Sequence, residues 1–185
     1  MHLLVLVAAL MLMAACTTSA PVDPAAPAGV QLPPPPREVR LDGVDPCSLL
    51  TAEQRSELGL ESVPKLTRPY VEFYRGEVAT CTLSGPPPDS VLLVVGVITT
   101  TGIERWFDSD VLAGITGITV AGFPAVVAAP RNVSDYCSVA VGTARGQVLD
   151  VQFGGGNTTA RATQDYWCDQ AERTADRVML TLLAA

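Results

Sequence analysis

Hydrophobic residues follow two different periods along this chain, and each period predicts a different kind of element. Val91–Ile98 is a continuous apolar and largely β-branched run, which is typical of a central strand buried on both faces. Apolar and polar residues alternate over residues 136–142 and 147–153, and Arg145-Gly146 between them favours a hairpin turn. Shorter strands are expected at residues 77–84, 118–121 and 125–129.

A spacing of three and four residues predicts two amphipathic helices. The longer one covers about residues 160–183, and its apolar stripe consists of Cys168, Ala171, Ala175, Val178 and Leu182. The shorter one covers residues 102–113, where the apolar positions are Ile103, Trp106, Phe107 and Leu112.

A capping box predicts a third, short helix over residues 51–58. Thr51 is a favourable N-cap, and Gln54 three residues later can bind back to it. Gly59 follows, where a left-handed backbone conformation often ends a helix. The order of helix, strands, short helix, strands and long helix indicates an α+β fold, in which helices pack on an antiparallel sheet.

The N-terminal part of the chain predicts export. The apolar run at residues 3–15 is too short to span a bilayer but suits a signal peptide, expected over residues 1–15. The run ends in Leu12-Met-Ala-Ala-Cys16, which resembles the lipobox of bacterial lipoproteins. Cys16 is therefore the predicted lipidation site, and the protein is expected on the extracytoplasmic face of the cell membrane. A non-lipidated secretory signal is the alternative, since Met13 is unusual in a lipobox and no Lys or Arg precedes the run.

Residues 16–43 are predicted to be a flexible Pro/Ala-rich tether. They contain several isolated prolines and the run Pro33-Pro-Pro-Pro36, and they lack apolar periodicity. The remaining residues, 44–185, have the length of a single domain.

Four cysteines follow Cys16, and an even number in an exported chain predicts two disulfides. A zinc site is disfavoured, because the chain has no CxxC pair and no histidine near a cysteine. Pairing Cys47 with Cys81 and Cys137 with Cys168 would tie a helix to a strand in each case, and this arrangement is favoured. The crossed arrangement, Cys47 with Cys168 and Cys81 with Cys137, stays open.

Charge and composition argue against several functions. The net charge of −7 disfavours nucleic-acid binding, which requires Lys and Arg to neutralise phosphates. The single histidine, His2, lies in the predicted signal peptide, so a Ser-His-Asp or Cys-His arrangement cannot form. Asp108 and Asp110 are expected at a solvated helix end, with weak calcium binding as the alternative. No metal, cofactor or enzymatic activity is predicted.

Six aromatic residues are candidates for a ligand pocket beside the sheet. They are Tyr70, Phe73, Tyr74, Trp106, Phe107 and Trp167. Aromatic clusters in a small domain more often belong to the hydrophobic core, so the core is the favoured interpretation for them.

Several short motifs together resemble a known family. They are Asp45-Pro-Cys-Ser-Leu-Leu-Thr51, Cys81-Thr-Leu83, Gly122-Phe-Pro-Ala125, Cys137-Ser-Val-Ala-Val141, Gly146-Gln147 and a cysteine early in the terminal helix. Over about residues 44–183 the chain is similar to the DUF3558 family of actinobacterial envelope lipoproteins. This resemblance implies an α/β/α sandwich of the Mog1/PsbP-like type. Leu83 is one departure from the family pattern, because an aromatic residue often follows the strand cysteine in related sequences. The motifs are structural and imply no activity.

These observations favour a non-enzymatic binding or interaction module at the cell envelope. Its expected partners are the membrane, through the N-terminal lipid, and an envelope protein or lipid. The alternative is a carrier or sensor of an apolar envelope molecule such as a lipid, which a closed apolar pocket would favour. A hydrolase would require two carboxylates within about 10 Å in one cleft.

Overall fold

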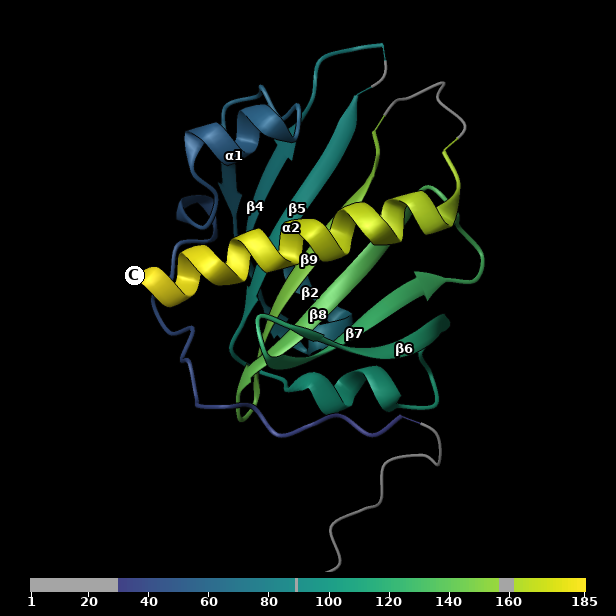
Figure 1. Ribbon diagram of the computed structural model, residues 1–185. Helices are drawn as coiled ribbons and strands as arrows, with labels where there is room; N and C mark the ends of the chain where they lie inside the picture. Colours follow the sequence, from purple (N-terminus) through teal and green to yellow (C-terminus); the bar gives the residue numbers. More distant parts are fainter. Residues whose placement is uncertain (1–29, 89, 157–161) are drawn as a thin grey trace, which may run out of the picture.

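The computed structural model describes residues 30–88, 90–156 and 162–185. The predicted signal peptide and Cys16 lie outside these residues. The dominant element is a seven-stranded antiparallel sheet with the strand order β1-β4-β5-β9-β8-β7-β6 (Figure 1). Its strands are β1 (Lys65–Thr67), β4 (Ala79–Ser84), β5 (Val91–Ile98), β6 (Ala113–Val120), β7 (Phe123–Pro130), β8 (Tyr136–Ala144) and β9 (Gln147–Gly155).

The remaining elements are short, with one exception. A second, two-stranded sheet consists of β2 (Tyr70–Val71) and β3 (Gly76–Glu77). The helices are η1 (Pro46–Ser48), α1 (Ala52–Glu57), η2 (Glu72–Tyr74), η3 (Ile103–Phe107) and α2 (Gln164–Ala184), where η marks a 3-10 helix. Within the described residues, no helix has both the length and the hydrophobicity that a membrane span requires.

The centre of the sheet joins two parts of the chain that are far apart in sequence. Strands β6 to β9 form a meander, and β9 then pairs with β5, so that Val95 lies opposite Val151. The apolar run Val91–Ile98 is therefore an interior strand, as predicted. The hairpin of β8 and β9 is also confirmed, with Gly146 at a positive φ of 70° in its turn.

Helix α2 covers one face of the sheet (Figure 1). The predicted apolar stripe is confirmed, because Ala171, Ala175, Val178 and Leu182 are buried against β7, β8 and β9. The helix begins at Gln164, because the Thr163 hydroxyl accepts a hydrogen bond from the Tyr166 amide at 3.3 Å and caps it.

Helix α1 has the predicted capping box. The Thr51 hydroxyl accepts from the Gln54 amide at 3.2 Å, and the Gln54 side chain accepts from the Thr51 amide at 2.8 Å. Gly59 has the expected positive φ of 67°.

Two disulfides fasten the segments on the α2 face of the sheet. Cys47 is bonded to Cys81, which joins η1 to β4, and Cys137 is bonded to Cys168, which joins β8 to α2. This is the arrangement favoured from the sequence, and the crossed alternative is wrong. The cysteines of the first bond are 34 residues apart in sequence, and those of the second are 31 apart. Each bond therefore restricts a long stretch of the unfolded chain.

The predicted helix at residues 102–113 is wrong beyond its first part. Only Ile103–Phe107 is helical, and β6 begins at Ala113 rather than at residue 118. The buried Arg105 binds the carboxylates of Asp108 and Asp110, and these contacts turn the chain out of the helix. Trp106 therefore lies in η3 and Leu112 in the loop before β6, and their helical spacing is coincidental.

The predicted tether is also too long. Leu41 is fully buried in the main core, and its amide donates to the Gln147 side chain at 2.6 Å. The Val39 amide donates to the carbonyl of Thr143 at 2.8 Å. Val39 and Leu41 alternate with charged residues, but this two-residue pattern is too short to stand out in the sequence.

Candidate functional site

The second face of the sheet, opposite α2, holds a cavity of about 290 Å³ that is open on one side. Its apolar wall comes from the segment around η2, from η3 and from the start of β6, and it includes Val71, Phe73, Tyr74, Trp106, Val111 and Leu112. Its polar wall comes from β8 and β9 and consists of Tyr136, Ser138 and Gln152. Residues that lie far apart in the sequence therefore form one pocket.

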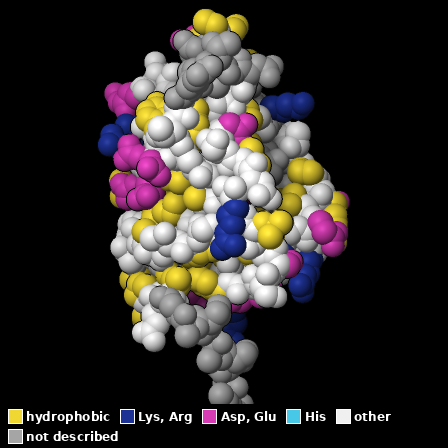
Figure 2. Space-filling model, turned by 90° about the vertical axis from the view of Figure 1, so that its right-hand side faces the viewer, with side chains coloured by type: hydrophobic (Ala, Val, Ile, Leu, Met, Phe, Trp, Pro, Cys, Tyr) yellow, Lys and Arg dark blue, Asp and Glu magenta, His cyan; other side chains and the backbone are white. Residues whose placement is uncertain are grey.

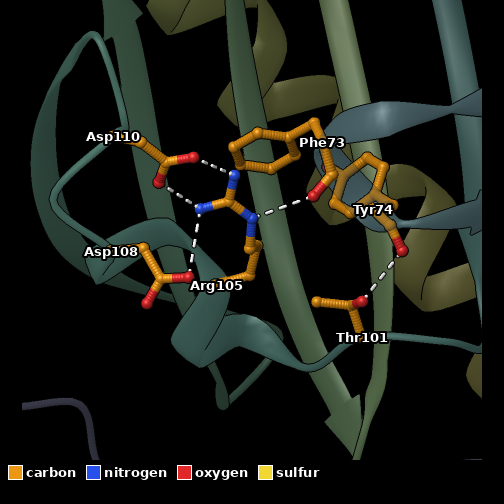
Figure 3. A network of polar contacts seen from close by, with 6 residues as sticks. All are labelled: Phe73, Tyr74, Thr101, Arg105, Asp108 and Asp110. Carbon is orange, nitrogen blue, oxygen red and sulfur yellow. Dashed lines mark hydrogen bonds and ion pairs between the residues drawn. The ribbon is translucent and has the colours of Figure 1, made fainter.

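The aromatic wall is a packed cluster of three rings. The Phe73 ring lies 4.6 Å from the Trp106 ring and 4.8 Å from the Tyr74 ring, edge-on in the second case. The backbone of η2 is held in place by two threonines. The hydroxyl of Thr100 donates to the carbonyl of Tyr74 at 3.0 Å, and that of Thr101 donates to the same carbonyl at 2.9 Å (Figure 3 shows Thr101). Edge-on and tilted ring pairs contribute about 0.5–1.5 kcal/mol each beyond the buried area.

The six aromatic candidates separate into different environments. Phe73, Tyr74 and Trp106 lie together at the cavity, where they also belong to a second hydrophobic core. Phe107 packs against the same core but does not line the cavity. Tyr70 is 63% exposed, and Trp167 lies on the opposite face of the sheet, so for these two the pocket hypothesis is wrong.

Arg105 fixes the loop that closes one side of the cavity. Its guanidinium is only 7% exposed and binds both oxygens of Asp110 at 2.7 and 2.8 Å, and one oxygen of Asp108 at 3.1 Å (Figure 3). It also donates to the carbonyl of Phe73 at 2.9 Å and lies 4.3 Å from the centre of the Phe73 ring. These contacts hold Val111 and Leu112 at the cavity.

The same contacts explain the environment of the two carboxylates, Asp108 and Asp110, that the sequence singled out. Hydrogen bonding to Arg105 lowers the pKa of Asp110, and hydrogen bonding to Asp110 raises the pKa of Arg105. Asp108 and Asp110 are ion-paired with an arginine rather than arranged around a cation site. Among the described residues, no three His, Cys, Asp or Glu side chains are grouped as metal ligands.

A buried carboxyl lies behind the polar wall. Asp150, on β9, is 3% exposed and accepts hydrogen bonds from the Ser138 hydroxyl and, at 2.9 Å, from the Gln152 amide. Burial raises its pKa, and the hydrogen bonds from Ser138 and Gln152 partly oppose this effect. The part of the chain that the structure describes provides no ion pair for Asp150.

Two hydrogen-bond donors of the aromatic wall have no partner within residues 30–88, 90–156 and 162–185. They are the Tyr74 hydroxyl and the Trp106 indole N–H, both buried. Burial and the nearby Asp150 charge raise the pKa of Tyr74 well above its ordinary value, although no hydrogen bond of normal geometry joins the two groups. A buried donor without a partner destabilises a protein by about 1–3 kcal/mol, so two of them side by side need an explanation.

A second hollow, of about 180 Å³, adjoins the cavity on the same face of the sheet. It shares Tyr136 and Gln152 with the cavity and extends to Leu92 and Val94 on β5. Its floor is Gly154, where an added Cβ would lie 2.5 Å from the carbonyl of Asp135. Only glycine fits at this position without a shift of the backbone.

Four residues of the site were not predicted from the sequence: Arg105, Ser138, Asp150 and Gln152. Asp150 and Gln152 alternate with apolar residues in the predicted strand, so they could be expected on one face. No sequence pattern indicated that this face is covered, or that the aromatic residues near position 73 cover it.

The comparisons with known proteins concern the whole of this architecture. A family model described as "Protein of unknown function (DUF3558)" matches residues 11–181. The chain belongs to the DUF3558 family. The match includes both disulfides and every residue of the cavity in this DUF3558 protein. No curated protein and no solved structure matches the chain.

Proposed function

We propose that this DUF3558 protein is a non-enzymatic binding module on the extracytoplasmic face of the cell membrane, anchored there by lipid on Cys16. The observation that carries the proposal is the cavity beside η2 and η3. It combines an apolar, aromatic wall with a few buried polar groups, which is the usual make-up of a small-molecule or side-chain pocket.

The proposed location is supported by two independent features. Disulfides persist in oxidising compartments outside the cytosol, and this domain has two of them. The segment that ends at Cys16 resembles a lipobox, and the family match begins before it, at residue 11. Two or three acyl chains at one terminus would anchor the protein firmly, whereas one chain alone binds membranes only marginally. The resemblance further suggests an actinobacterial source.

The absence of catalysis is proposed from the side chains at the site. Asp108 and Asp110 are occupied by Arg105, and Asp150 is buried behind the polar wall. The only histidine of the chain is His2, in the predicted signal peptide. The described part of the cavity therefore has groups that can bind a ligand, but no base and nucleophile in contact with each other.

The alternative function is a carrier or sensor of an apolar envelope molecule such as a lipid. The two adjoining hollows favour it, because a short apolar chain could lie across Tyr136 and Gln152 into the second hollow. The cavity is at the lower end of the usual ligand-pocket range of about 300–1,000 Å³ and is open on one side. This size suits one ring or side chain better than a complete lipid.

The fold is further proposed to be a variant of the Mog1/PsbP-like sandwich. Helix α2 would form one outer layer, and η2, η3 and the β2–β3 sheet would form the other. In place of a second long helix, this outer layer leaves room for the cavity. A crystal structure compared with members of that fold would test the relationship.

Filling the cavity tests the proposed function. Ala113→Phe adds a ring at the cavity wall, and Val111→Trp does so from the loop if the first variant folds poorly. Leu180→Phe is the control, because Leu180 is 55% exposed on α2, on the other side of the sheet. Each full-length protein is cross-linked in the native envelope and purified, and the attached lipids and proteins are identified by mass spectrometry.

The proposal expects at least one molecule that the wild type and Leu180→Phe retain and the cavity variants lose. If all the proteins retain the same molecules, the cavity is not the binding site. Co-purification of a lipid, lost on filling the cavity, would favour the carrier function.

A further inference from the structure

We propose that the cavity binds a neutral ring that bears a hydroxyl group, such as a phenol or the side chain of a tyrosine in a partner protein. This inference rests on the proposed function of the cavity as a binding site and names the chemistry of its ligand. Three properties of the cavity lead to it: its size, its unpaired hydrogen-bonding groups and its charge.

The size and the walls of the cavity suit one substituted ring. A dry apolar cavity of about 150 Å³ is sufficient to bind benzene, and this cavity has about 290 Å³ and one open side. Phe73, Tyr74 and Trp106 already pack edge-on or tilted against one another, with centroid distances from 4.6 to 6.4 Å. A ring in the cavity would extend this cluster with further contacts of the same kind.

The unpaired polar groups favour a ligand that carries a hydroxyl. The Trp106 indole N–H can only donate, whereas the Tyr74 hydroxyl can donate and accept, and neither has a hydrogen-bond partner among the described residues. The Asp150 carboxyl close to Tyr74 is held by the cavity residues Ser138 and Gln152 and can still accept. A hydroxyl both accepts and donates, so it matches two donors beside one acceptor better than an amine or an ether does.

The charges near the cavity exclude an anionic ligand. Arg105 is the nearest buried cation, and its guanidinium is already used by Asp108, Asp110 and the carbonyl of Phe73. The described residues that line the cavity include no Lys or Arg, whereas Asp150 adds an acidic group behind them. A carboxylate or phosphate on the ligand would therefore be buried without a counter-charge.

The two tryptophans of the chain provide a matched pair of reporters. Trp106 lies at the cavity, and Trp167 lies under α2 on the other face of the sheet, beside Phe153 and Tyr166. The full chain, labelled with ¹⁵N, should show two indole N–H signals, and Trp167→Phe assigns them. A hydrogen bond from the Trp106 N–H to a ligand oxygen moves that signal downfield, while the Trp167 signal stays in place as a control for folding.

The titration uses probes that differ by one hydroxyl. 4-Methylphenol and toluene represent free ligands, and the N-acetyl amides of tyrosine and phenylalanine represent partner side chains. We expect the hydroxyl-bearing member of at least one pair to move the Trp106 signal and to bind about three- to tenfold more tightly than its partner, the ratio that one neutral hydrogen bond supplies. Tyr74→Phe should reduce this ratio. The pair that shows the larger ratio identifies the source of the ring.

The outcomes separate this inference from the proposed function. If toluene and phenylalanine amide move the Trp106 signal and bind as tightly as the hydroxyl-bearing probes, the cavity binds rings but the hydroxyl specificity is wrong. Benzoate binding as tightly as 4-methylphenol would likewise contradict the neutral ligand. If no probe moves the Trp106 signal, the cavity is not a binding site, and the proposed function fails as well.

Discussion

At the scale of single residues, the most unusual feature is a carboxyl buried without a cation. Asp150 has hydrogen bonds from Ser138 and Gln152, but burial is the largest influence on its pKa and raises it. Arg105 is the contrasting case, since its charge is buried together with two carboxylates and a carbonyl. Both residues lie beside the same cavity. The charge of Arg105 is balanced by Asp108 and Asp110 in the loop, whereas the Asp150 carboxyl behind the polar wall has no ion pair among the described residues.

Asp150→Asn should change how stability depends on pH. An unfolded aspartate titrates near pH 3.9, and the folded pKa of Asp150 is higher, so the native state binds this proton more tightly. Its contribution to the free energy of unfolding therefore falls as pH rises from the unfolded to the folded pKa. The neutral amide of the variant should remove this fall and make the variant more stable than the wild type above the folded pKa. Urea denaturation at a series of pH values from about 4 to 8 measures the effect.

Asp110→Asn is the control, because the contribution of Asp110 to the free energy of unfolding should depend on pH in the opposite direction. The pKa of Asp110 is lowered by Arg105, so its contribution is present above the unfolded pKa and is lost as pH falls. This variant should lose stability at neutral pH and little at strongly acidic pH. Parallel pH curves for Asp150→Asn and the wild type would contradict the assignment of a raised pKa to Asp150.

At the scale of elements, short contacts decide where helices end. The pattern at residues 102–113 resembles one amphipathic helix, yet η3 stops at Phe107 because Arg105 binds Asp108 and Asp110. Helix α1 and the start of α2 follow their N-caps instead, at Thr51 and Thr163. The cap at Thr51 was predicted, because Thr followed three residues later by Gln is a recognisable capping box, whereas the cap at Thr163 was not.

Arg105→Lys should loosen the loop after η3. Lysine cannot bind Asp110 through two parallel hydrogen bonds and also reach the carbonyl of Phe73, so the free energy of unfolding should fall by about 1–3 kcal/mol. Amide hydrogen exchange at residues 108–112 should accelerate more than exchange in β8. Arg173→Lys is the matched control, because Arg173 forms an exposed pair with Asp169 that should contribute less than about 1 kcal/mol. Equal losses in both variants would mean that Arg105 does not hold the loop.

At the scale of the whole molecule, α2 covers one face of the sheet, and two hollows lie on the other. Helix α2 and both disulfides stabilise the first face, and the cavity and its adjoining hollow occupy the second. On the side of the molecule seen in Figure 2, hydrophobic side chains form separate patches among acidic and basic ones. This division would let the domain remain stable while the proposed ligand binds at the second face.

Cys16→Ser tests the proposed anchor. The wild type should incorporate an alkyne-labelled fatty acid and sediment with membranes, and the variant should lose the label and be released from the membrane fraction. Thr17→Ala, next to the same site, should behave as the wild type. Labelling that survives in Cys16→Ser would place the lipid elsewhere or remove the lipoprotein assignment.

From the sequence alone, most of the long elements, the favoured cysteine pairing and the family resemblance could be predicted. The strands β5, β8 and β9, the capping box of α1 and the stripe of α2 all follow from periods and caps within about twenty residues of chain. The bonds between Cys47 and Cys81 and between Cys137 and Cys168 were favoured because each ties a predicted helix to a predicted strand, and the structure excluded the crossed alternative. Such features depend on local backbone geometry, so residues close together in the sequence are sufficient to predict them.

Only the tertiary structure decided the site. Trp106 and Trp167 were equal candidates in sequence, and the sheet places them on opposite faces. Leu41 was assigned to a tether but is buried in the main core, where Gln147, more than a hundred residues later, accepts its amide hydrogen bond. The cavity exists because residues around η2 and η3 pack over the face of β7, β8 and β9 that carries Ser138 and Gln152. The pairing of distant strands depends on the packing of the complete core, so a local sequence pattern does not predict which strands become neighbours.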